Sequence, residues 1–299
     1  MTNYPVSFFV FKRPKSTYDF LVRMHEAGIK KIYVFADGPR NTEEKILTKK
    51  VRDEINRFRE DYSNLNIITK YYQKNMGLRH NIVNGLNEVF KHENASIVIE
   101  DDCLVSPDFF RFTSEMLSKY QNNSKVMSIN GMTVGGDYDN YSYSFTKYPQ
   151  CWGWATWKRA WDLYDSNLKT LNYSRWNKIS SELSLNSFSR WYWWNILTLT
   201  KNHKISTWDY QWSYSHFLYH GLAVVPSRNL VSNIGFDNAA TNTKIKSKHV
   251  SEIKIDHLTW PLNHPVNISD NYTVSKNIER RFYLSFIAVM GLLKKKYLS

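Results

Sequence analysis

Short apolar runs alternate with longer amphipathic segments along the first third of the chain, and this alternation constrains the fold more than any other feature. Apolar runs with the length of buried strands are Val6–Phe11, Lys31–Ala36, Leu65–Tyr72 and Ala95–Ile99. The segments between them repeat apolar residues at helical spacing: Ser16–Gly28, Thr42–Tyr62 (Ile46, Leu47, Val51, Ile55, Phe58, Tyr62) and Gly77–Phe90. Because repeated strand–helix–strand units form parallel sheets with right-handed crossovers, the sequence predicts an α/β fold with a mostly parallel central sheet flanked by helices.

The second half of the chain has a weaker pattern. Val126–Ile129 is typical of one more strand, whereas Tyr148–Trp161 and Trp191–Trp212 are dense in aromatic residues without a clean period. Ser227–Lys248 is polar and has the composition of a mobile surface loop. Because no linker separates two domains, we expect one domain over residues 1–278, with halves at 1–130 and 131–278, followed by a basic amphipathic segment at 279–299.

Charge and cysteine content narrow the class of protein. The formal net charge is +13, from 40 basic and 27 acidic residues, but the basic residues are spread along the chain. A nucleic-acid-binding protein normally concentrates them, so we expect phosphorylated ligands or an anionic membrane surface as partners, and no nucleic acid. Cys103 and Cys151 form neither a metal-binding cluster nor a disulfide framework. Without a signal-peptide pattern at Met1–Val10, a cytoplasmic location is the simplest expectation.

The C-terminal segment combines an apolar run with flanking basic residues. Tyr283–Leu293 is mostly apolar and lies between Arg280-Arg281 and Lys294–Lys296. A membrane-spanning helix needs roughly 20 apolar residues, which is more than this run has. Two interpretations stay open. The segment is either a helix on an anionic membrane surface, which makes the protein peripheral at the inner face of the cell membrane, or a terminal helix packed on the domain.

The strongest local signal is Glu100-Asp101-Asp102, directly after the run Ala95–Ile99. Carboxylates that follow a buried strand are costly unless a cation or hydrogen-bond donors pair with them. Ligands bind at the carboxyl ends of the strands in an open parallel sheet, and Mn²⁺ or Mg²⁺ held there by carboxylates would neutralise a bound diphosphate. The alternative is a solvated acidic turn before a helix that starts at Pro107.

Two aromatic-rich motifs offer surfaces for a sugar. In the segment Trp208–Trp212, the indole rings would partly desolvate Asp209 and raise its pKa, which favours it as the proton acceptor for a hydroxyl group. An Asp that caps a helix is the alternative. In the segment Pro149–Trp157, Gly153 would allow close backbone approach and Trp154 would stack on a sugar ring, with an aromatic core segment as the alternative.

Asn75–His80 predicts an anion site at the start of a helix. Backbone amides there, together with Arg79, would bind the phosphate groups of a donor, and simple capping by Asn75 is the alternative. The sequence contains no GxGxxG pattern and no phosphate-binding loop signature. The classical dinucleotide-binding and P-loop classes therefore have no support.

Taken together, these segments resemble a known family. They occur in this order: Val6–Pro14, Asp37-Gly38, Glu100-Asp101-Asp102 with Pro107–Phe110, Gly153-Trp154, Trp208-Asp209 and Pro226–Phe236. The order is similar to that of the glycosyltransferase A fold, a Rossmann-like fold, in the branch of N-acetylglucosaminyltransferase I and its bacterial polysaccharide-glycosyltransferase relatives. The resemblance covers roughly Val6 to Asn242, and its most specific part is the Glu-Asp-Asp segment followed by Pro-Asp-Phe-Phe.

The resemblance implies roles on the donor side of a site. Asp102 would bind the metal ion, Asp101 would contact the donor ribose, and Glu100 would contact the transferred sugar. Arg13 and Asp37 would contact the base.

The resemblance also implies roles near the acceptor. Gly153, Trp154 and Trp208 would lie beside the donor sugar and the acceptor. The family's catalytic base is the second Asp of a Trp-Asp-Asp-Trp segment. Here the segment reads Trp-Asp-Tyr-Gln-Trp, so Asp209 is the candidate base and Asp237 is the reserve.

The motifs and this resemblance together predict a metal-dependent glycosyltransferase that binds a nucleotide sugar through residues 1–130 and an acceptor through residues 131–278. The resemblance implies that the reaction inverts the anomeric centre. A UDP-sugar, with UDP-N-acetylglucosamine first, is the expected donor, and a carbohydrate or lipid-linked saccharide of a bacterial surface polysaccharide is the expected acceptor. A sugar nucleotidyltransferase is one alternative, but it needs a glycine-rich loop where this chain has Arg13-Pro14-Lys15. A non-catalytic carbohydrate-binding protein is the other, and it would not need Glu100-Asp101-Asp102.

Overall fold

The computed structural model describes residues 4–235 and 254–297. Its strands are β1 (Val6–Val10), β2 (Lys31–Ala36), β3 (Asn66–Tyr71), β4 (Ala95–Glu100), β5 (Cys103–Val105), β6 (Val126–Asn130), β7 (Tyr143–Thr146), β8 (Trp154–Trp157), β9 (Leu222–Pro226) and β10 (Val231–Asn233). Its helices are α1 (Pro14–Glu26), α2 (Thr42–Asp61), α3 (Leu78–Val89), α4 (Pro107–Lys119), α5 (Lys158–Trp161), α6 (Tyr173–Glu182), α7 (Ser187–Lys201), α8 (Asp209–Leu218), α10 (Tyr272–Ile278), α11 (Phe286–Tyr297) and the π-helix η1 (Glu279–Tyr283). Within the described ranges, no helix has the length and apolar character needed to cross a membrane.

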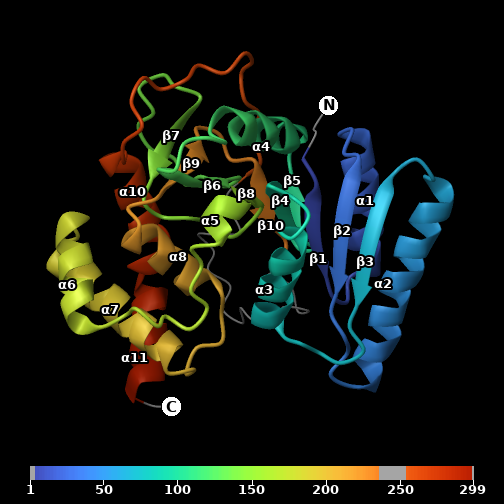
Figure 1. Ribbon diagram of the computed structural model, residues 1–299, viewed down its shortest axis with the longest axis horizontal. Helices are drawn as coiled ribbons and strands as arrows, with labels where there is room; N and C mark the ends of the chain where they lie inside the picture. The colour runs from blue at the N-terminus through green and yellow to red at the C-terminus, as the bar shows by residue number, and fades with distance from the viewer. Residues whose placement is uncertain (1–3, 236–253, 298–299) are drawn as a thin grey trace.

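One eight-stranded sheet organises the molecule, in the order β3-β2-β1-β4-β8-β6-β9-β7 (Figure 1). The pairs β3–β2, β2–β1, β1–β4 and β6–β9 are parallel, whereas β4–β8, β8–β6 and β9–β7 are antiparallel. Helices flank this sheet, and hydrophobic cores lie between it and the helices. The predicted α/β class, with a mostly parallel central sheet flanked by helices, is confirmed.

Side chains of β1 and β2 alternate between two helical layers. The ring of Phe8 lies 5.7 Å from that of Phe20 in α1, and Phe9 stacks on Phe35 at 5.0 Å on the opposite face, which α3 covers. Gly85 permits this close approach of α3, because a Cβ atom there would lie 2.5 Å from the ring of Phe9. Because helices cover both faces of these strands, their carboxyl ends are the part of the sheet that is open to a ligand.

The buried face of α2 differs from the predicted one. Ile46 is 57% exposed and Leu47 is only partly buried, so the predicted face is wrong at these two positions. The helix buries the predicted Val51, Ile55 and Phe58, and it also buries Thr48 and Glu44. Glu44 forms ion pairs with Arg40 and Lys12. These ion pairs compensate the cost of burying a charge in the first turn of the helix.

Strand β8 joins the two halves of the chain into one sheet. It runs antiparallel between β4 and β6, with Ser96 and Ser128 both opposite Thr156. No strand is predicted here from sequence. Trp154 and Trp157 are 1% and 3% exposed, and a strand that is buried on both faces has no polar–apolar alternation to reveal it.

Part of the stretch predicted as a mobile surface loop is a strand. Val231 pairs with Val105 in the antiparallel β10–β5 ribbon, and Leu230 and Val231 are fully buried. The side chain of Asn229 donates to the carbonyl of Val231 at 2.8 Å. The loop prediction is therefore wrong for this part of Ser227–Lys248, and residues 236–253 lie outside the described residues.

The helices of the second half form a separate aromatic core with the C-terminal elements. Tyr148 donates a buried hydrogen bond of 2.6 Å to Glu279 in η1, and its ring stacks on Trp193 at 6.1 Å. Leu292 of α11 is 1% exposed and belongs to the same core. The C-terminal helix thus packs on the domain beside α7 (Figure 1).

Candidate active site

A cavity of about 780 Å³ lies at the carboxyl ends of β1 and β4. It brings together residues that the sequence offered in separate motifs: Arg13, Asp37, Glu100, Asp101, Asp102, Trp208 and Asp209. Three further walls come from the start of α3, from α7, and from η1 with α11. One concave site therefore receives carboxylates from both halves of the chain.

Asp101 is held by partners from the end of β1. Its Oδ2 accepts a hydrogen bond from the backbone N–H of Phe11 at 2.8 Å, and its Oδ1 pairs with Nη1 of Arg13 at 3.2 Å. The same guanidinium nitrogen lies 3.9 Å from Oδ2 of Asp102. Arg13 therefore ties the end of β1 to the acidic end of β4.

Burial, and then the crowding of acids, raises the pKa values of two of them. Burial, and then the neighbouring Asp102, raises the pKa of Asp101 to about 6, against the opposing effect of Arg13. Burial also raises the pKa of Glu100 well above its usual value, with added repulsion from Asp102, Asp101 and Asp209. Such a cluster of carboxylates gains stability when a cation joins it.

Asp37 shapes the loop before α3. Its carboxylate accepts hydrogen bonds from the N–H groups of Gly38, Met76 and Gly77, at 2.8, 2.7 and 3.1 Å, and from the amide of Asn75 at 3.0 Å. Asn75 thus holds the loop rather than capping the helix, because the N-cap of α3 is Gly77. Asp37 lines the cavity with a side chain that is almost fully buried.

Asp209 is the first residue of α8 and lines the same cavity as Glu100, Asp101 and Asp102. Its Oδ1 accepts hydrogen bonds from the Thr207 hydroxyl and from the N–H of Tyr210. Burial raises the pKa of Asp209, whereas these hydrogen bonds act in the opposite direction. The N-cap of α8 is Trp208, so Asp209 does not occupy the capping position that the alternative interpretation gave it.

Three predicted site residues do not line this cavity. Arg79 donates to the carbonyl of Ser166 at 2.6 Å, on the outside of α3. Trp154 is buried and its ring stacks on Trp208 at 5.2 Å, so its indole face is not exposed to a sugar. Gly153 has a φ of +54°, a backbone conformation that favours glycine, and a Cβ atom there would lie 2.7 Å from Val231.

Two oxygen atoms beside the cavity suit a divalent cation. A Cβ atom on Gly235 would lie 2.3 Å from Oδ2 of Asp102 and 3.0 Å from Oδ1 of Asn233, so both oxygens lie close to this glycine, whose N–H donates to Oδ1 of Asn233 at 2.7 Å. Over residues 4–235 and 254–297, no three His, Cys, Asp or Glu side chains gather as a metal site. Mg²⁺ and similar ions often bind through one or two protein oxygens, with ligand phosphates and water completing the shell, and these residues fit that pattern.

The C-terminal elements complete the cavity. Arg281, Phe282 and Tyr283 of η1 line it, and Phe282 packs edge-on against Trp152 at 6.0 Å. Asp237, the reserve candidate for a catalytic base, lies outside the described residues. Sequence reasoning missed Asn233, Thr207 and the η1 residues, since only the fold brings them to the acidic strand end.

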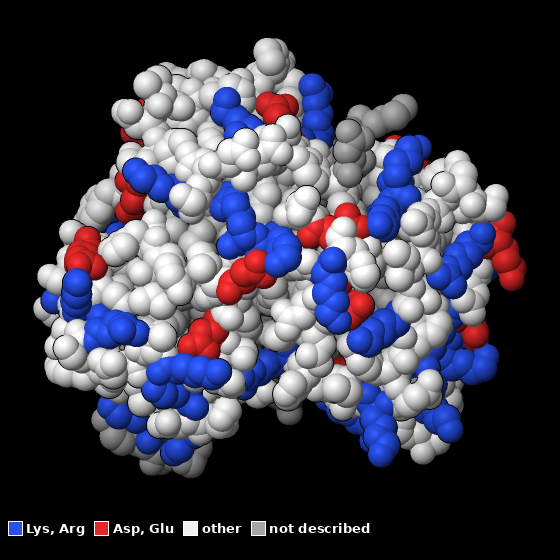
Figure 2. All heavy atoms as spheres, in the orientation of Figure 1, with Lys and Arg blue, Asp and Glu red and all other residues white. Residues whose placement is uncertain are grey.

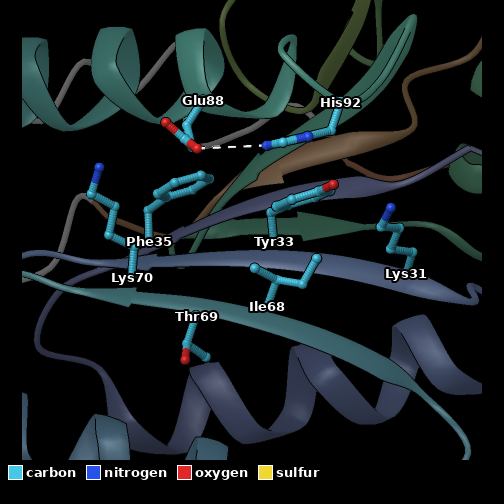
Figure 3. Close-up of a pocket in the computed structure, with 8 residues that line it drawn as sticks. All are labelled: Lys31, Tyr33, Phe35, Ile68, Thr69, Lys70, Glu88 and His92. Carbon is cyan, nitrogen blue, oxygen red and sulfur yellow. Dashed lines mark ion pairs between the residues drawn. The ribbon is translucent and has the colours of Figure 1, made fainter.

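A second cavity, of about 520 Å³, lies between α3 and the strands β2 and β3 (Figure 3). Tyr33 and Phe35 point toward α3, and Glu88 of this helix forms an ion pair at 3.7 Å with His92, which follows the helix. Tyr33 donates to Glu93 at 2.7 Å, and that carboxylate also binds Lys31. None of the predicted site residues lines this cavity, so the candidate active site is the larger one.

Basic side chains are spread over the face shown in Figure 2, with acidic side chains among them near its middle. They do not gather into a single stripe on this face, in line with the sequence pattern.

Comparisons with known proteins gave structural likeness only. Neither a protein-family model nor a curated protein matches the sequence. A mannosyltransferase from Pyrobaculum calidifontis, in complex with GDP-Man and Mn²⁺, is 13% identical with a TM-score of 0.37, over 52% of this chain and 44% of that chain. This chain thus spans less than half the length of that enzyme.

Two nucleotidyltransferase structures are similar over more of the chain. An apo UDP-glucose pyrophosphorylase is 12% identical with a TM-score of 0.37, over 77% of this chain and 93% of that chain. A protein assigned as a glucose-1-phosphate thymidylyltransferase from Bacillus anthracis, in complex with a sucrose, is 10% identical with a TM-score of 0.39. The match covers 85% of this chain and 98% of that chain. At these scores and identities, the likeness identifies neither the reaction nor the substrate of this chain.

Proposed function

We propose that this chain is a metal-dependent, inverting glycosyltransferase that moves a sugar from a nucleotide sugar to a carbohydrate or lipid-linked saccharide acceptor. The observation that carries the proposal is the shared cavity, which is lined by the acids Glu100–Asp102 at a strand end and by a separate carboxylate, Asp209. A UDP-sugar is the proposed donor, with UDP-N-acetylglucosamine first, and synthesis of a bacterial surface polysaccharide is the proposed setting.

The donor occupies the strand-end part of the cavity in this proposal. Arg13 and Asp37, together with the start of α3, contact the nucleotide, whereas Glu100 faces the transferred sugar. Asp102 and Asn233 would hold Mn²⁺ or Mg²⁺, since an oxygen of each lies close to Gly235. When bound, the ion would neutralise the negative charge of the diphosphate leaving group.

Asp209 accepts the proton of the acceptor hydroxyl in this proposal. The acceptor oxygen forms a bond to the anomeric carbon, the bond from that carbon to the diphosphate breaks, and the hydroxyl proton passes to Asp209. Because burial raises the pKa of Asp209, its carboxylate is a stronger base than an exposed one. Attack from the side opposite the leaving group inverts the anomeric centre.

An anionic membrane surface is the proposed further partner, with the protein peripheral at the inner face of the cell membrane. The outer side of α11 supports this proposal, because Phe286 and Met290 are 79% and 48% exposed and Lys294 follows one turn later. Apolar side chains beside basic ones favour binding to a bilayer with anionic lipids.

Calorimetric titration of UDP with and without Mn²⁺, followed by a screen for sugar release from a panel of nucleotide sugars, tests the proposal. We expect UDP to bind only with the metal ion and one UDP-sugar to be hydrolysed slowly without an acceptor. Release of diphosphate from a nucleoside triphosphate and a sugar phosphate would instead indicate a nucleotidyltransferase. Saccharide binding without any nucleotide binding would indicate a carbohydrate-binding protein.

A further inference from the structure

The outer side of α7 carries a row of aromatic side chains. Phe188, Trp191 and Trp194 follow one another at every third residue, so each ring is the neighbour of the next on the helix surface. Phe188 is 48% exposed, and the two indole rings are partly exposed. Tyr173, the first residue of α6, is 62% exposed and extends the row, because its ring meets that of Trp194 edge-on at 5.3 Å. These four side chains form an aromatic strip that is open to solvent.

The aromatic strip lies outside the candidate active site. α6 packs against α7 at the opposite end of the molecule from α2 (Figure 1). Tyr192 and Ile196 of α7 line the active-site cavity, whereas the four residues of the aromatic strip line neither of the two cavities described above. α7 therefore presents one side to the cavity and another to solvent.

The apolar side chains of α6 and α7 are sorted by type. The aliphatic residues Ile196, Leu197 and Leu199 of α7 are all buried, whereas its most exposed apolar side chain is that of Phe188. A contiguous exposed apolar surface normally marks a binding site. Aromatic rings offer flat apolar faces, and the C–H groups on one face of a pyranose ring form a matching flat surface. The composition of the aromatic strip therefore favours a saccharide as its ligand.

The rings of the aromatic strip are held in place before any ligand binds. Phe188 and Trp191 stack at 5.6 Å with an angle of 12° between their planes, and the two indole rings also pack against the aromatic core below. Rings that are already fixed lose little conformational freedom on binding. Ser174 and Ser187, which adjoin the strip in the chain, are exposed and offer hydroxyl groups to the polar edge of a sugar.

The basic side chains of α6 and α7 are engaged within the protein. Their partners are as follows: Arg175 donates to the carbonyl of Thr170 at 3.3 Å, Arg190 to that of Leu185 at 2.8 Å and Lys201 to that of Leu171 at 2.7 Å, and Lys178 pairs with Glu182 at 4.0 Å. A surface that binds anionic lipids or nucleic acid needs basic groups that point outward to the partner. An uncharged ligand fits these two helices better.

We infer that the aromatic strip binds a neutral saccharide chain at a site separate from the candidate active site. The apolar faces of successive sugar rings pack on the aromatic rings, and their hydroxyl groups remain at the polar edges. The row from Phe188 to Trp194 rises about 9 Å along the helix axis, so a chain of several sugars contacts more rings than a single sugar does. The inference goes beyond the proposed transfer reaction and does not depend on it.

Fluorine NMR of the full-length chain labelled with 5-fluorotryptophan tests the location of the site. The variants Trp191→Phe and Trp194→Phe assign the two resonances of the aromatic strip. We expect chitohexaose, a neutral saccharide chain, to shift both resonances, whereas UDP with Mn²⁺ should leave them unchanged. If chitohexaose shifts only the resonances of Trp152 and Trp208, which line the active-site cavity, the saccharide binds there and the inference is overturned.

Calorimetry measures the affinity. Chitohexaose should bind about tenfold or more tightly than N-acetylglucosamine, because only the longer chain reaches several rings. The double variant Tyr173→Ser with Phe188→Ser removes the two most exposed rings and should weaken chitohexaose binding about tenfold or more. Tyr272→Ser removes a tyrosine of α10 that is 68% exposed, and this matched control should bind as the wild type does. Circular dichroism verifies that the helices persist in each variant.

Three results would refute the saccharide site: no chitohexaose binding to the wild type, equal binding to the wild type and the double variant, or equal weakening by Tyr272→Ser. If the double variant retains chitohexaose binding but sediments less with phosphatidylserine vesicles, the aromatic strip is a membrane contact and the inference fails.

UDP titration with Mn²⁺ separates this inference from the proposed function. If UDP binds but the double variant leaves chitohexaose binding unchanged, the transferase proposal stands and the saccharide site is refuted. If chitohexaose binding depends on Tyr173 and Phe188 while UDP does not bind at all, the saccharide site is supported and the transferase is refuted.

Discussion

The hydroxyl group of Thr207 donates a hydrogen bond to Oδ1 of Asp209, at the start of α8. The same oxygen accepts the N–H of Tyr210 at 3.0 Å. Among the described residues, none donates a hydrogen bond to Oδ2 of Asp209. One oxygen of this carboxylate is therefore held by the protein, and the other remains for a ligand in the cavity.

Asp209→Asn tests the role of that second oxygen. An amide retains the hydrogen-bonded oxygen but has no basic atom in place of Oδ2, so we expect kcat to fall by about 10²- to 10⁴-fold. UDP binding should stay within threefold of wild type, because Asp209 is not among the residues proposed to contact the nucleotide or the metal ion. Release of UDP under steady-state conditions and calorimetry measure the two quantities. Near-normal turnover would contradict the assignment and direct the search to Asp237.

Thr207→Val tests how the pKa of Asp209 is set. The hydrogen bond from Thr207 lowers this pKa against the effect of burial, so its removal should raise the pKa. The acidic limb of the kcat–pH profile should then move to higher pH, since the base must be deprotonated to act. Thr207→Ser retains the hydroxyl group and should restore the wild-type profile. An unchanged acidic limb in Thr207→Val would refute the coupling.

Asp102→Asn tests the cation site. An amide is a weaker ligand than a carboxylate for a hard cation, so we expect the Kd for Mn²⁺, measured in the presence of UDP, to rise at least tenfold. Turnover should be lost with it. Full activity of the wild-type protein in excess chelator would argue against a metal-dependent reaction.

Asp101→Asn should act on the fold rather than on the metal. Asp101 holds the backbone of Phe11 and the side chain of Arg13, and an amide nitrogen beside a guanidinium group cannot accept its hydrogen bond. We expect a lower Tm, measured by scanning calorimetry, with less change in Mn²⁺ binding than in Asp102→Asn. The reverse pattern would assign the metal to Asp101.

The exposed side of α11 predicts membrane binding that can be removed without disturbing the core. The triple variant Phe286→Ser, Met290→Ser and Lys294→Gln should lose at least tenfold in partitioning to phosphatidylserine vesicles, measured by sedimentation, because burying one such apolar side chain is worth about 1.5–3 kcal/mol. Lys49→Gln on α2, an exposed basic residue on another part of the surface, is the control for charge alone. Truncation at Arg280 is a poorer test, because it removes Leu292 from the core. Equal sedimentation of all three proteins would contradict membrane docking.

His216 gives a prediction for stability against pH. Burial lowers its pKa from 6.5 to about 3, and its ring nitrogens lie 2.9 Å from the Ser128 hydroxyl and 3.1 Å from the Trp212 carbonyl. Between pH 6.5 and 3 the unfolded chain binds a proton that the folded chain excludes, so His216 lowers the free energy of unfolding as the pH falls. From pH 6.5 to 5 the wild type should lose about 2 kcal/mol relative to His216→Gln, by urea denaturation. Parallel pH profiles would exclude a buried neutral imidazole.

The first part of the fold follows from the sequence because its signals are local. The runs that become β1, β2, β3 and β4 are short, apolar and separated by amphipathic helices, and repeated units of this kind predict the parallel pairing that these strands have. Glu100–Asp102 could be placed at a site because carboxylates directly after a buried strand need partners. These parts require no knowledge of distant contacts.

The second part of the fold could not be predicted from the sequence because its structure depends on contacts between residues that are far apart in the chain. Trp154 reads as a sugar-binding aromatic, yet it lies in a strand covered on both faces, and only its pairing with β4 and β6 makes that strand. Asn233 meets Asp102 through the β10–β5 ribbon, whose strands are far apart in the chain. The wall of the cavity that η1 and α11 form depends on the packing of α11 against α7, and no local pattern encodes that contact.

The pairing of β8 with both β4 and β6 has a mechanical consequence. A rotation of one half of the molecule against the other would have to break the ladder that aligns Val98 with Trp154 and Ala95 with Trp157. Each hydrogen bond lost from such a ladder leaves buried polar groups without partners, which makes a hinge there unfavourable. We therefore expect the sheet to stay rigid when a ligand enters or leaves the cavity, and any movement to occur in the segments at the mouth of the cavity.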